Sequence, residues 1–231
     1  MALKRIALAV EYDGQGFCGW QRQPHCHSVQ AEVEAALGQI SQQEVTVYCA
    51  GRTDTGVHAS AQIVHFDTDL ERPLRAWTFG ANSHLDKRVA IHWAAEVPLD
   101  FHARFSALDR SYRYTILNRA TRPGYQAGTM GWERIPLDAD RMNRAAQALL
   151  GEHDFSSFRS AECQANHAVR TMKRIEVRRE LTAWLSRSQP TVFFITWSES
   201  LRVVCWLSVG AIVMKTGWRP YYQLATVLKP E

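Results

Sequence analysis

The sequence predicts an α+β protein whose two halves are built around a mostly antiparallel sheet. Short β-branched runs that alternate apolar and polar residues recur along the chain, and two stretches have the spacing of amphipathic helices. Each half repeats the order strand, helix, strand, which is typical of an α+β layout with helices flanking a sheet. The halves meet near residues 105–110, so the expected units are residues 1–105 and residues 106–231.

The first half is expected to contain one long helix among several strands. Ser28 is a suitable N-cap for a helix over residues 28–40, in which Val29, Val33 and Leu37 share one face. The expected strands cover residues 6–12, 44–49, 61–66 and 89–94, and a short helix covers residues 73–81.

The second half is expected to begin with a strand over residues 110–117. Side chains alternate across a strand, so Tyr112 and Tyr114 should share one face and Arg113 should lie on the other. A second amphipathic helix is expected over residues 138–149 and a further strand over residues 171–178.

The basic charge of the chain permits an anionic partner. The chain of 231 residues has a formal net charge of +4 at pH 7. Its basic runs, at residues 104–122 and 170–179, fit either a solvated face or an RNA-facing stripe. No signal peptide is evident, and the apolar stretch at residues 203–213 is shorter than the ~20 residues of a membrane span.

The cysteines favour reduced thiols in a cytoplasmic protein over a disulfide framework. There are five of them, an odd number, with no CxxC spacing. The run His25-Cys26-His27 lacks the two spaced ligand pairs of a zinc site, so we interpret it as a surface turn.

The segment A-G-R-T-D-T-G-V-H-A at residues 50–59 is the leading candidate for chemistry. It follows an expected strand and places Arg52 and Asp54 between two glycines. A nearby guanidinium can keep a carboxylate ionised, and an ionised carboxylate can serve as nucleophile or base. The residues alone favour the alternative that Asp54 is a turn cap in a glycine-rich loop.

Tyr112 is the leading candidate for base stacking. It lies between Arg110 and Arg113, and aromatic side chains interleaved with arginines suit a nucleobase and its phosphates. The alternative is a core tyrosine of an alternating strand. The segment at residues 101–107 likewise fits either a structural loop or a phosphate contact.

Several ordered motifs resemble the tRNA pseudouridine synthase A (TruA) family. The resemblance covers about residues 4–180, and the G-R-T-D-x-G-V-H pattern is highly specific. The matching segments are E-Y-D-G at 11–14, G-W-Q-R-Q at 19–23, S-V-Q at 28–30, A-G-R-T-D-T-G-V-H at 50–58, F-H-A-R-F-S-A at 101–107, R-Y at 113–114 and L-G-E-H-D-F-S-S-F-R at 150–159.

The resemblance implies a fold, an activity and a set of roles. The fold would be two similar halves of a continuous sheet with a basic cleft between them. The enzyme would convert uridine to pseudouridine at positions 38, 39 and 40 of the tRNA anticodon stem-loop, as a homodimer, with no metal or organic cofactor. The family's catalytic aspartate matches Asp54, its active-site arginine matches Arg52, and its base-stacking tyrosine matches Tyr112.

After about residue 180 the chain departs from the family pattern. The family continues into F-L-H-H-M-V-R, whereas residues 193–199 read F-F-I-T-W-S-E. Reading the codons one base earlier gives Phe or Leu followed by a stretch that can read H-H-M-V-R. We therefore infer a frame break between about residues 180 and 184, which leaves residues 181–231 out of frame and predicts a poorly stable, weakly active polypeptide.

Two other functions are consistent with some of these observations. The altered C-terminus could leave a catalytically impaired tRNA-binding remnant. A metal-dependent hydrolase could use Asp54, His58 and His65, although no further carboxylate or histidine cluster completes such a site.

Overall fold

A computed structural model describes residues 2–124, 127–158, 169–181, 191–200 and 222–227. The chain divides into two compact units. Unit 1 comprises Met1–Leu108 and Gln223–Glu231, and unit 2 comprises Asp109–Tyr222. The mixed α/β class and the mostly antiparallel strand pairing agree with the sequence prediction. The similarity of the two halves and their continuous sheet stay predictions.

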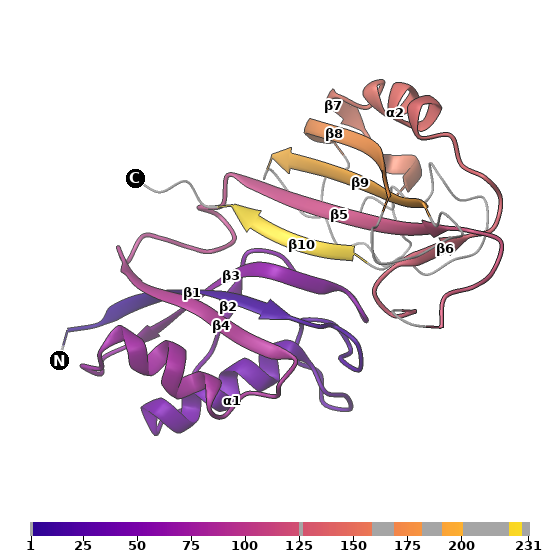
Figure 1. Cartoon of the computed structure of the whole chain (residues 1–231). Helices are drawn as coiled ribbons and strands as arrows, with labels where there is room; N and C mark the ends of the chain where they lie inside the picture. The colour runs from indigo at the N-terminus through magenta and orange to yellow at the C-terminus, as the bar shows by residue number, and fades with distance from the viewer. Residues whose placement is uncertain (1, 125–126, 159–168, 182–190, 201–221, 228–231) are drawn as a thin grey trace. The chain divides into compact units, whose positions relative to one another are not determined.

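The sheet of unit 1 is built around its first strand (Figure 1). β1 (Lys4–Tyr12) pairs antiparallel with both β4 (Val89–Val97) and β3 (His58–Thr68). β2 (Tyr48–Cys49) pairs antiparallel with β3, and β10 (Tyr222–Val227) pairs in parallel with the beginning of β3. Consecutive residues in the middle of β1 are buried, so both faces of this strand are covered.

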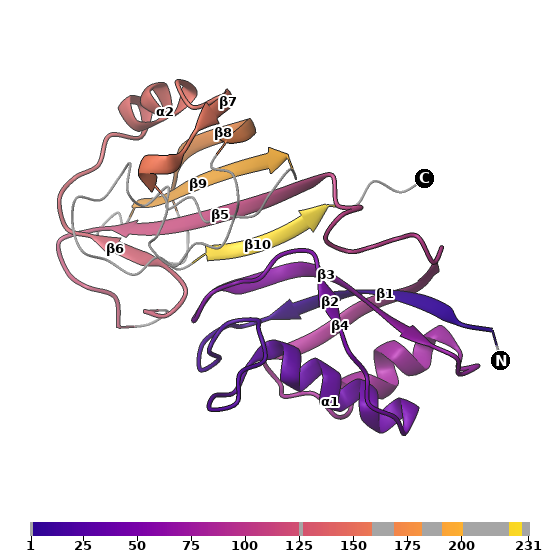
Figure 2. The same cartoon turned by 180° about the vertical axis from the view of Figure 1, so that it is seen from behind.

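One long helix packs against this sheet, as both views show (Figures 1 and 2). α1 (Val29–Ser41) begins where the sequence predicts, because the Ser28 hydroxyl accepts a hydrogen bond from Ala31 N at 3.4 Å. Val33 and Leu37 are fully buried on its inner face. The short helix expected over residues 73–81 contains a π-helical turn, η1 (Ala76–Gly80).

The strand expected over residues 44–49 is shorter than predicted. Only Tyr48–Cys49 pairs with β3, because side chains of α1 satisfy the backbone before it. Val47 N donates to Glu34 Oε1 at 3.0 Å, and Gln30 Nε2 donates to Val47 O at 3.2 Å. A residue bound in this way has no backbone groups left for a neighbouring strand.

The strands of unit 2 pair mostly antiparallel. They follow the order β5 (Asp109–Asn118), β9 (Thr191–Ser200), β8 (Val169–Leu181) and β7 (Gly151–Asp154). A short strand, β6 (Gly131–Glu133), pairs in parallel with β5.

A single α-helix of unit 2 covers this sheet in the described part of the chain. α2 (Ala139–Gln147) begins at Asp138, whose carboxylate accepts from Arg141 N at 2.9 Å, and it packs against β8. A 3₁₀ turn, η2 (Ser156–Phe158), follows β7.

Two strands, β9 and β10, lie within the segment that we infer to be out of frame. β9 fills the place between β5 and β8. Residues 182–190 and 201–221 of the same segment lie outside the described residues. The frame break therefore stays a prediction.

Candidate active site

The Asp54 loop, residues 50–57, connects β2 to β3 and begins as a continuation of their pairing. Ala50 N donates to Ile63 O at 2.8 Å. The buried side chain of Gln62 then replaces the next backbone pairing, because its oxygen accepts from Gly51 N at 3.3 Å and its nitrogen donates to Gly51 O. Gln62 thus fixes the start of the loop. Gln62 is the one amide side chain in the sequence of β3.

Thr53 anchors the middle of the loop to the core. Its hydroxyl lies 2.7 Å from the Tyr12 hydroxyl, and its carbonyl accepts from Trp20 N at 2.9 Å. Burial raises the pKa of the Tyr12 phenol well above its usual value, so this hydroxyl stays protonated. The side chains before and after Thr53, those of Arg52 and Asp54, are exposed.

The glycines of the neighbouring loop allow backbone to pack directly on the Asp54 loop. Gly19 has φ +87°, and a Cβ built there would lie 2.5 Å from Thr53 O and 2.9 Å from the carbonyl carbon of Asp54. A Cβ at Gly14 would collide with the backbone of Val57. The E-Y-D-G and G-W-Q-R-Q motifs therefore support the Asp54 loop from one side.

His58 connects the same neighbouring loop to the beginning of β3. Its Nδ1 lies 3.0 Å from an oxygen of the Asp13 carboxylate and 3.3 Å from Gly14 N. The loop then closes with a turn in which Val57 N donates to Asp54 O at 3.1 Å. The arrangement holds the Asp54 backbone in place and leaves its side chain at the surface.

Arg52 and Asp54 lie in the same loop, on either side of the inward-facing Thr53. In the described part of the chain Arg52 forms no ion pair, so its pairing with Asp54 stays a prediction. The exposed carboxylate is placed where it can react with an external substrate.

Tyr112 lies on β5 in unit 2 and is half-buried. The alternation expected for this strand is present, because Tyr114 is buried whereas Arg113 between them is exposed. Asp54 belongs to unit 1, so the stacking role of Tyr112 beside it stays a prediction.

Carboxylates accompany the basic residues of β8. Arg174 lies 2.6 Å from Glu176, Arg178 lies 2.7 Å from Glu180, and Lys173 pairs with Asp109. Exposed pairs of this kind balance the local charge, which favours a solvated face for residues 173–180.

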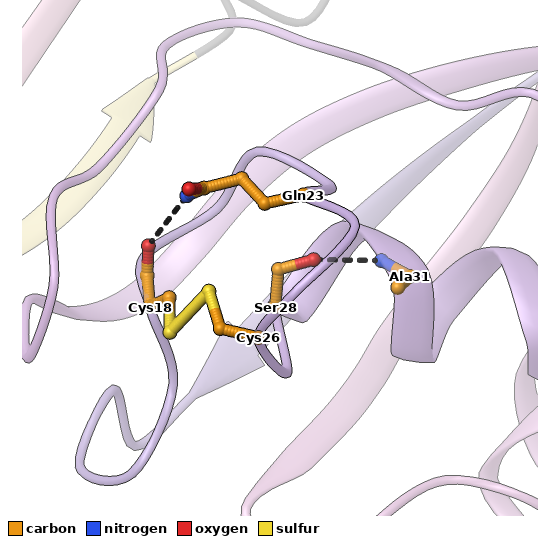
Figure 3. The surroundings of a disulfide bond; sticks show 5 residues. All are labelled: Cys18, Gln23, Cys26, Ser28 and Ala31. Atoms are coloured by element: carbon orange, nitrogen blue, oxygen red, sulfur yellow. Dashed lines mark hydrogen bonds between the residues drawn. A yellow bond between two sulfur atoms is a disulfide. The ribbon is translucent and has the colours of Figure 1, made fainter.

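The prediction of reduced thiols is wrong for two cysteines. Cys18 and Cys26 form a disulfide (Figure 3), with their Cα atoms 6.2 Å apart. The loop that ends at α1 folds back on itself, with Cys18 N donating to His27 O at 2.9 Å and a bridge between Gln23 and Cys26. This folding brings together two sulfurs that are eight positions apart in the sequence.

The described residues contain no group of three or more histidine, cysteine or acidic side chains that could hold a metal ion. His58 faces Asp13, and His65 accepts from Ala103 N at 3.1 Å through its Nδ1. The hydrolase interpretation therefore has no support from the geometry. No helix within the described ranges is long and apolar enough to cross a membrane.

A family model described as tRNA pseudouridine synthase matches residues 8–106 and 145–194. The chain belongs to this family of isomerases. The first matched segment includes the whole Asp54 loop together with the glycines that support it.

Curated relatives named tRNA pseudouridine synthase A agree with the family assignment. The protein of Thiobacillus denitrificans is 55% identical over 177 residues, which are 77% of this chain and 68% of the relative. That of Nitrosomonas eutropha is 52% identical over 173 residues, 75% of this chain and 62% of the relative. That of Xylella fastidiosa is 46% identical over 228 residues, 98% of this chain and 86% of the relative.

Proposed function

We propose that this chain converts uridine to pseudouridine in tRNA, at positions 38, 39 and 40 of the anticodon stem-loop. Asp54 is the nucleophile, Arg52 holds its carboxylate ionised, and Tyr112 stacks on the target base. One observation carries the proposal: hydrogen bonds and close packing hold the backbone at and next to Asp54, while its side chain stays exposed. Preorganisation of a nucleophile in this way is what covalent catalysis requires.

The target base must leave the helical stem before Asp54 can reach it. Flipping a nucleotide out of the stack costs a few kcal/mol. Stacking of the flipped uracil on Tyr112 would offset part of this cost. Arg52 would also offset the repulsion between the Asp54 carboxylate and the RNA phosphates.

The reaction is an isomerisation in which all atoms are conserved. Asp54 attacks the target nucleotide, the bond between the ribose and N1 of uracil breaks, and the freed uracil turns. A carbon–carbon bond then forms between the ribose and C5, C5 loses its proton, and N1 gains one. The Asp54 carboxylate is regenerated. Because there is no net oxidation or reduction, the proposed chemistry needs no redox cofactor.

The decisive experiment measures tritium release from tRNA that contains 5-tritiated uridine. We expect Asp54→Asn to lower the rate by at least ~10³-fold, which corresponds to roughly 4 kcal/mol of transition-state stabilisation. Asp69→Asn is the matched control, because Asp69 is also an exposed carboxylate of unit 1. Equal rates for the two variants would rule out Asp54 as the nucleophile.

We further propose that the chain is a cytoplasmic homodimer. Sedimentation velocity tests the oligomeric state, and a single species with the mass of one chain would contradict it. The family match does not favour the alternative of an impaired RNA-binding remnant.

A further inference from the structure

The turn after β4, residues 98–107, presents a phenylalanine to solvent. The Phe105 residue is 75% exposed. Its backbone is fixed, because Phe105 N and Ser106 N both donate to His102 O, at 2.9 and 2.7 Å. The Ser106 hydroxyl accepts in return from His102 N at 2.9 Å. An apolar ring on a rigid turn loses little conformational entropy when it binds a ligand.

The base of this turn is anchored in unit 1. Ala103 is fully buried, and its N–H donates to His65 on β3. The Arg5 guanidinium donates to the carbonyls of Leu99 and Phe101, at 2.6 and 2.7 Å. Asp67 fixes the same guanidinium through two hydrogen bonds. The position of Phe105 is therefore determined by the sheet.

Four aromatic rings form a series of contacts that runs from the sheet to the tip of the turn. Tyr48 lies 5.2 Å from His65, His65 lies 4.6 Å from His102, and His102 lies 4.4 Å from Phe105, measured between ring centroids. Burial lowers the pKa of His65 to about 4 and also lowers the pKa of His102. Both imidazoles are thus neutral at pH 7, and the series ends in the exposed Phe105.

A guanidinium accompanies the exposed ring. The Arg104 guanidinium carbon lies 5.7 Å from the centre of the Phe105 ring. Among the described residues Arg104 forms no ion pair, whereas Asp67 is paired with Arg5 and the charge of Asp100 also acts on Arg5. An exposed aromatic ring beside such a cation matches the chemistry of an unpaired base and its phosphate.

We propose that Phe105 stacks on an unpaired base of the tRNA and that Arg104 contacts an adjacent phosphate. This contact rests on the proposed function for its RNA partner. It involves no bond-making step and lies outside the Asp54 loop. Phe105 and Arg104 therefore act in binding and not in chemistry.

The test compares the RNA affinity of variants in which an exposed phenylalanine, Phe105 or Phe79, is replaced. Full-length chains that carry Asp54→Asn are titrated with a fluorescently labelled tRNA transcript, so that binding is measured without turnover. We expect Phe105→Ala to weaken binding by roughly 5- to 100-fold, the range for loss of one base–aromatic stack. Phe105→Trp should retain the affinity. Phe79→Ala is the matched control, since Phe79 is 80% exposed in the same unit.

Salt dependence tests the phosphate contact separately. Arg104→Gln should lower the slope of log affinity against log salt by about one, and Phe105→Ala should leave this slope unchanged. Circular dichroism of each variant verifies that the fold is intact.

Equal RNA affinity for Phe105→Ala and Phe79→Ala would overturn the inference. A second outcome would also overturn it. If Phe105→Ala changed the sedimentation of the RNA-free protein, and RNA affinity varied only with the fraction of dimer, the ring would contact a second copy of the chain and not the RNA. The proposed function is tested independently by tritium release from the wild-type chain. Failure of the tritium-release test and failure of the RNA-affinity test can therefore be told apart.

Discussion

At the residue scale, two glycines with the same backbone conformation have different tasks around Asp54. Gly19 has φ +87° and Gly56 has φ +79°, a region that side-chain-bearing residues rarely adopt. An added Cβ at Gly19 would strike the backbone of Thr53 and Asp54, whereas at Gly56 it would meet nothing within 4 Å. Comparing substitutions at the two glycines therefore distinguishes the effect of a steric clash from the effect of backbone strain.

We predict that Gly19→Ala lowers activity by about ten-fold or more and destabilises the protein more than Gly56→Ala does. Gly56→Ala carries only the cost of the left-handed conformation, about 1–2 kcal/mol. Gly19→Ala carries that cost and also displaces the Asp54 backbone. Urea unfolding and tritium release measure the two effects. Equal losses in both variants would mean that the close approach at Gly19 is unimportant.

A buried histidine makes the stability of unit 1 depend on pH. Burial lowers the pKa of His65 to about 4, below the ordinary value of about 6.5 that applies to the unfolded chain. Between these values the unfolded chain binds more protons, so stability is full above about pH 6.5 and falls as the pH drops toward 4. We predict a loss of up to about 2 kcal/mol between pH 7 and pH 5.

Urea unfolding at the two pH values measures this loss. His65→Gln should reduce the pH dependence, whereas His84→Gln, a change at an exposed histidine of the same unit, should leave it as in the wild type. A wild-type protein with equal stability at pH 5 and pH 7 would contradict the prediction.

At the element scale, the contact between α1 and the chain before β2 depends on a buried carboxylate. Glu34 accepts from Val47 N at 3.0 Å and from Gln30 Nε2 at 2.9 Å, and it lies 3.1 Å from the Arg22 guanidinium. Removal of Glu34 would leave the Val47 N–H without its acceptor and would take away one of the two acceptors of the buried Gln30 amide.

We predict that Glu34→Ala lowers the free energy of unfolding by about 3 kcal/mol. Glu44→Ala, the same change at an exposed position between α1 and β2, should cost less than about 0.5 kcal/mol. Chemical denaturation of both variants provides the comparison. A similar small cost at both positions would show that the Glu34 contacts contribute little.

The disulfide constrains the loop that supports Asp54, because Cys18 directly precedes Gly19. Closing a loop of this length stabilises a protein by about 2–3 kcal/mol in the chain-entropy account. We predict that reductant lowers the urea midpoint of the wild type but not that of the Cys18→Ser, Cys26→Ser double variant. Thiol titration that finds all five cysteines free in the native protein would refute the bond.

At the scale of the whole molecule, the C-terminal segment decides whether unit 2 is complete. β9 is hydrogen-bonded between β5 and β8, so the strand pairing of unit 2 depends on residues that we infer to be out of frame. β10 contributes to unit 1 in the same way, through its pairing with the start of β3.

We predict that the chain as written unfolds at a lower temperature, and is less active, than a chain whose codons are read one base earlier after residue 180. The physical reason is that an out-of-frame segment carries no selected packing. Calorimetry and tritium release compare the two chains, and the DNA sequence across codons 178–190 shows whether a base is missing or added. Cooperative melting with full activity of the chain as written would refute the prediction.

Local patterns in the sequence determined much of the fold and located the candidate site. Alternation predicted β1, β4 and β5, and Ser28 and Asp138 marked the beginnings of the two helices. The ordered motifs predicted the family, and the family match confirmed it. These features depend on residues close together in the chain, so the sequence alone carries their signal.

The tertiary structure alone decided how distant segments support Asp54. Three contacts join positions that no local pattern relates. They are the packing of Gly14 and Gly19 on the Asp54 loop, the hydrogen bond between Tyr12 and Thr53, and the hydrogen bond between Gln62 and Gly51. The same is true of the Cys18–Cys26 bond and of Val47, whose backbone binds α1 in place of a strand. Each depends on which surfaces meet after folding, because hydrogen-bonding groups and sulfurs take the partners that packing brings within reach.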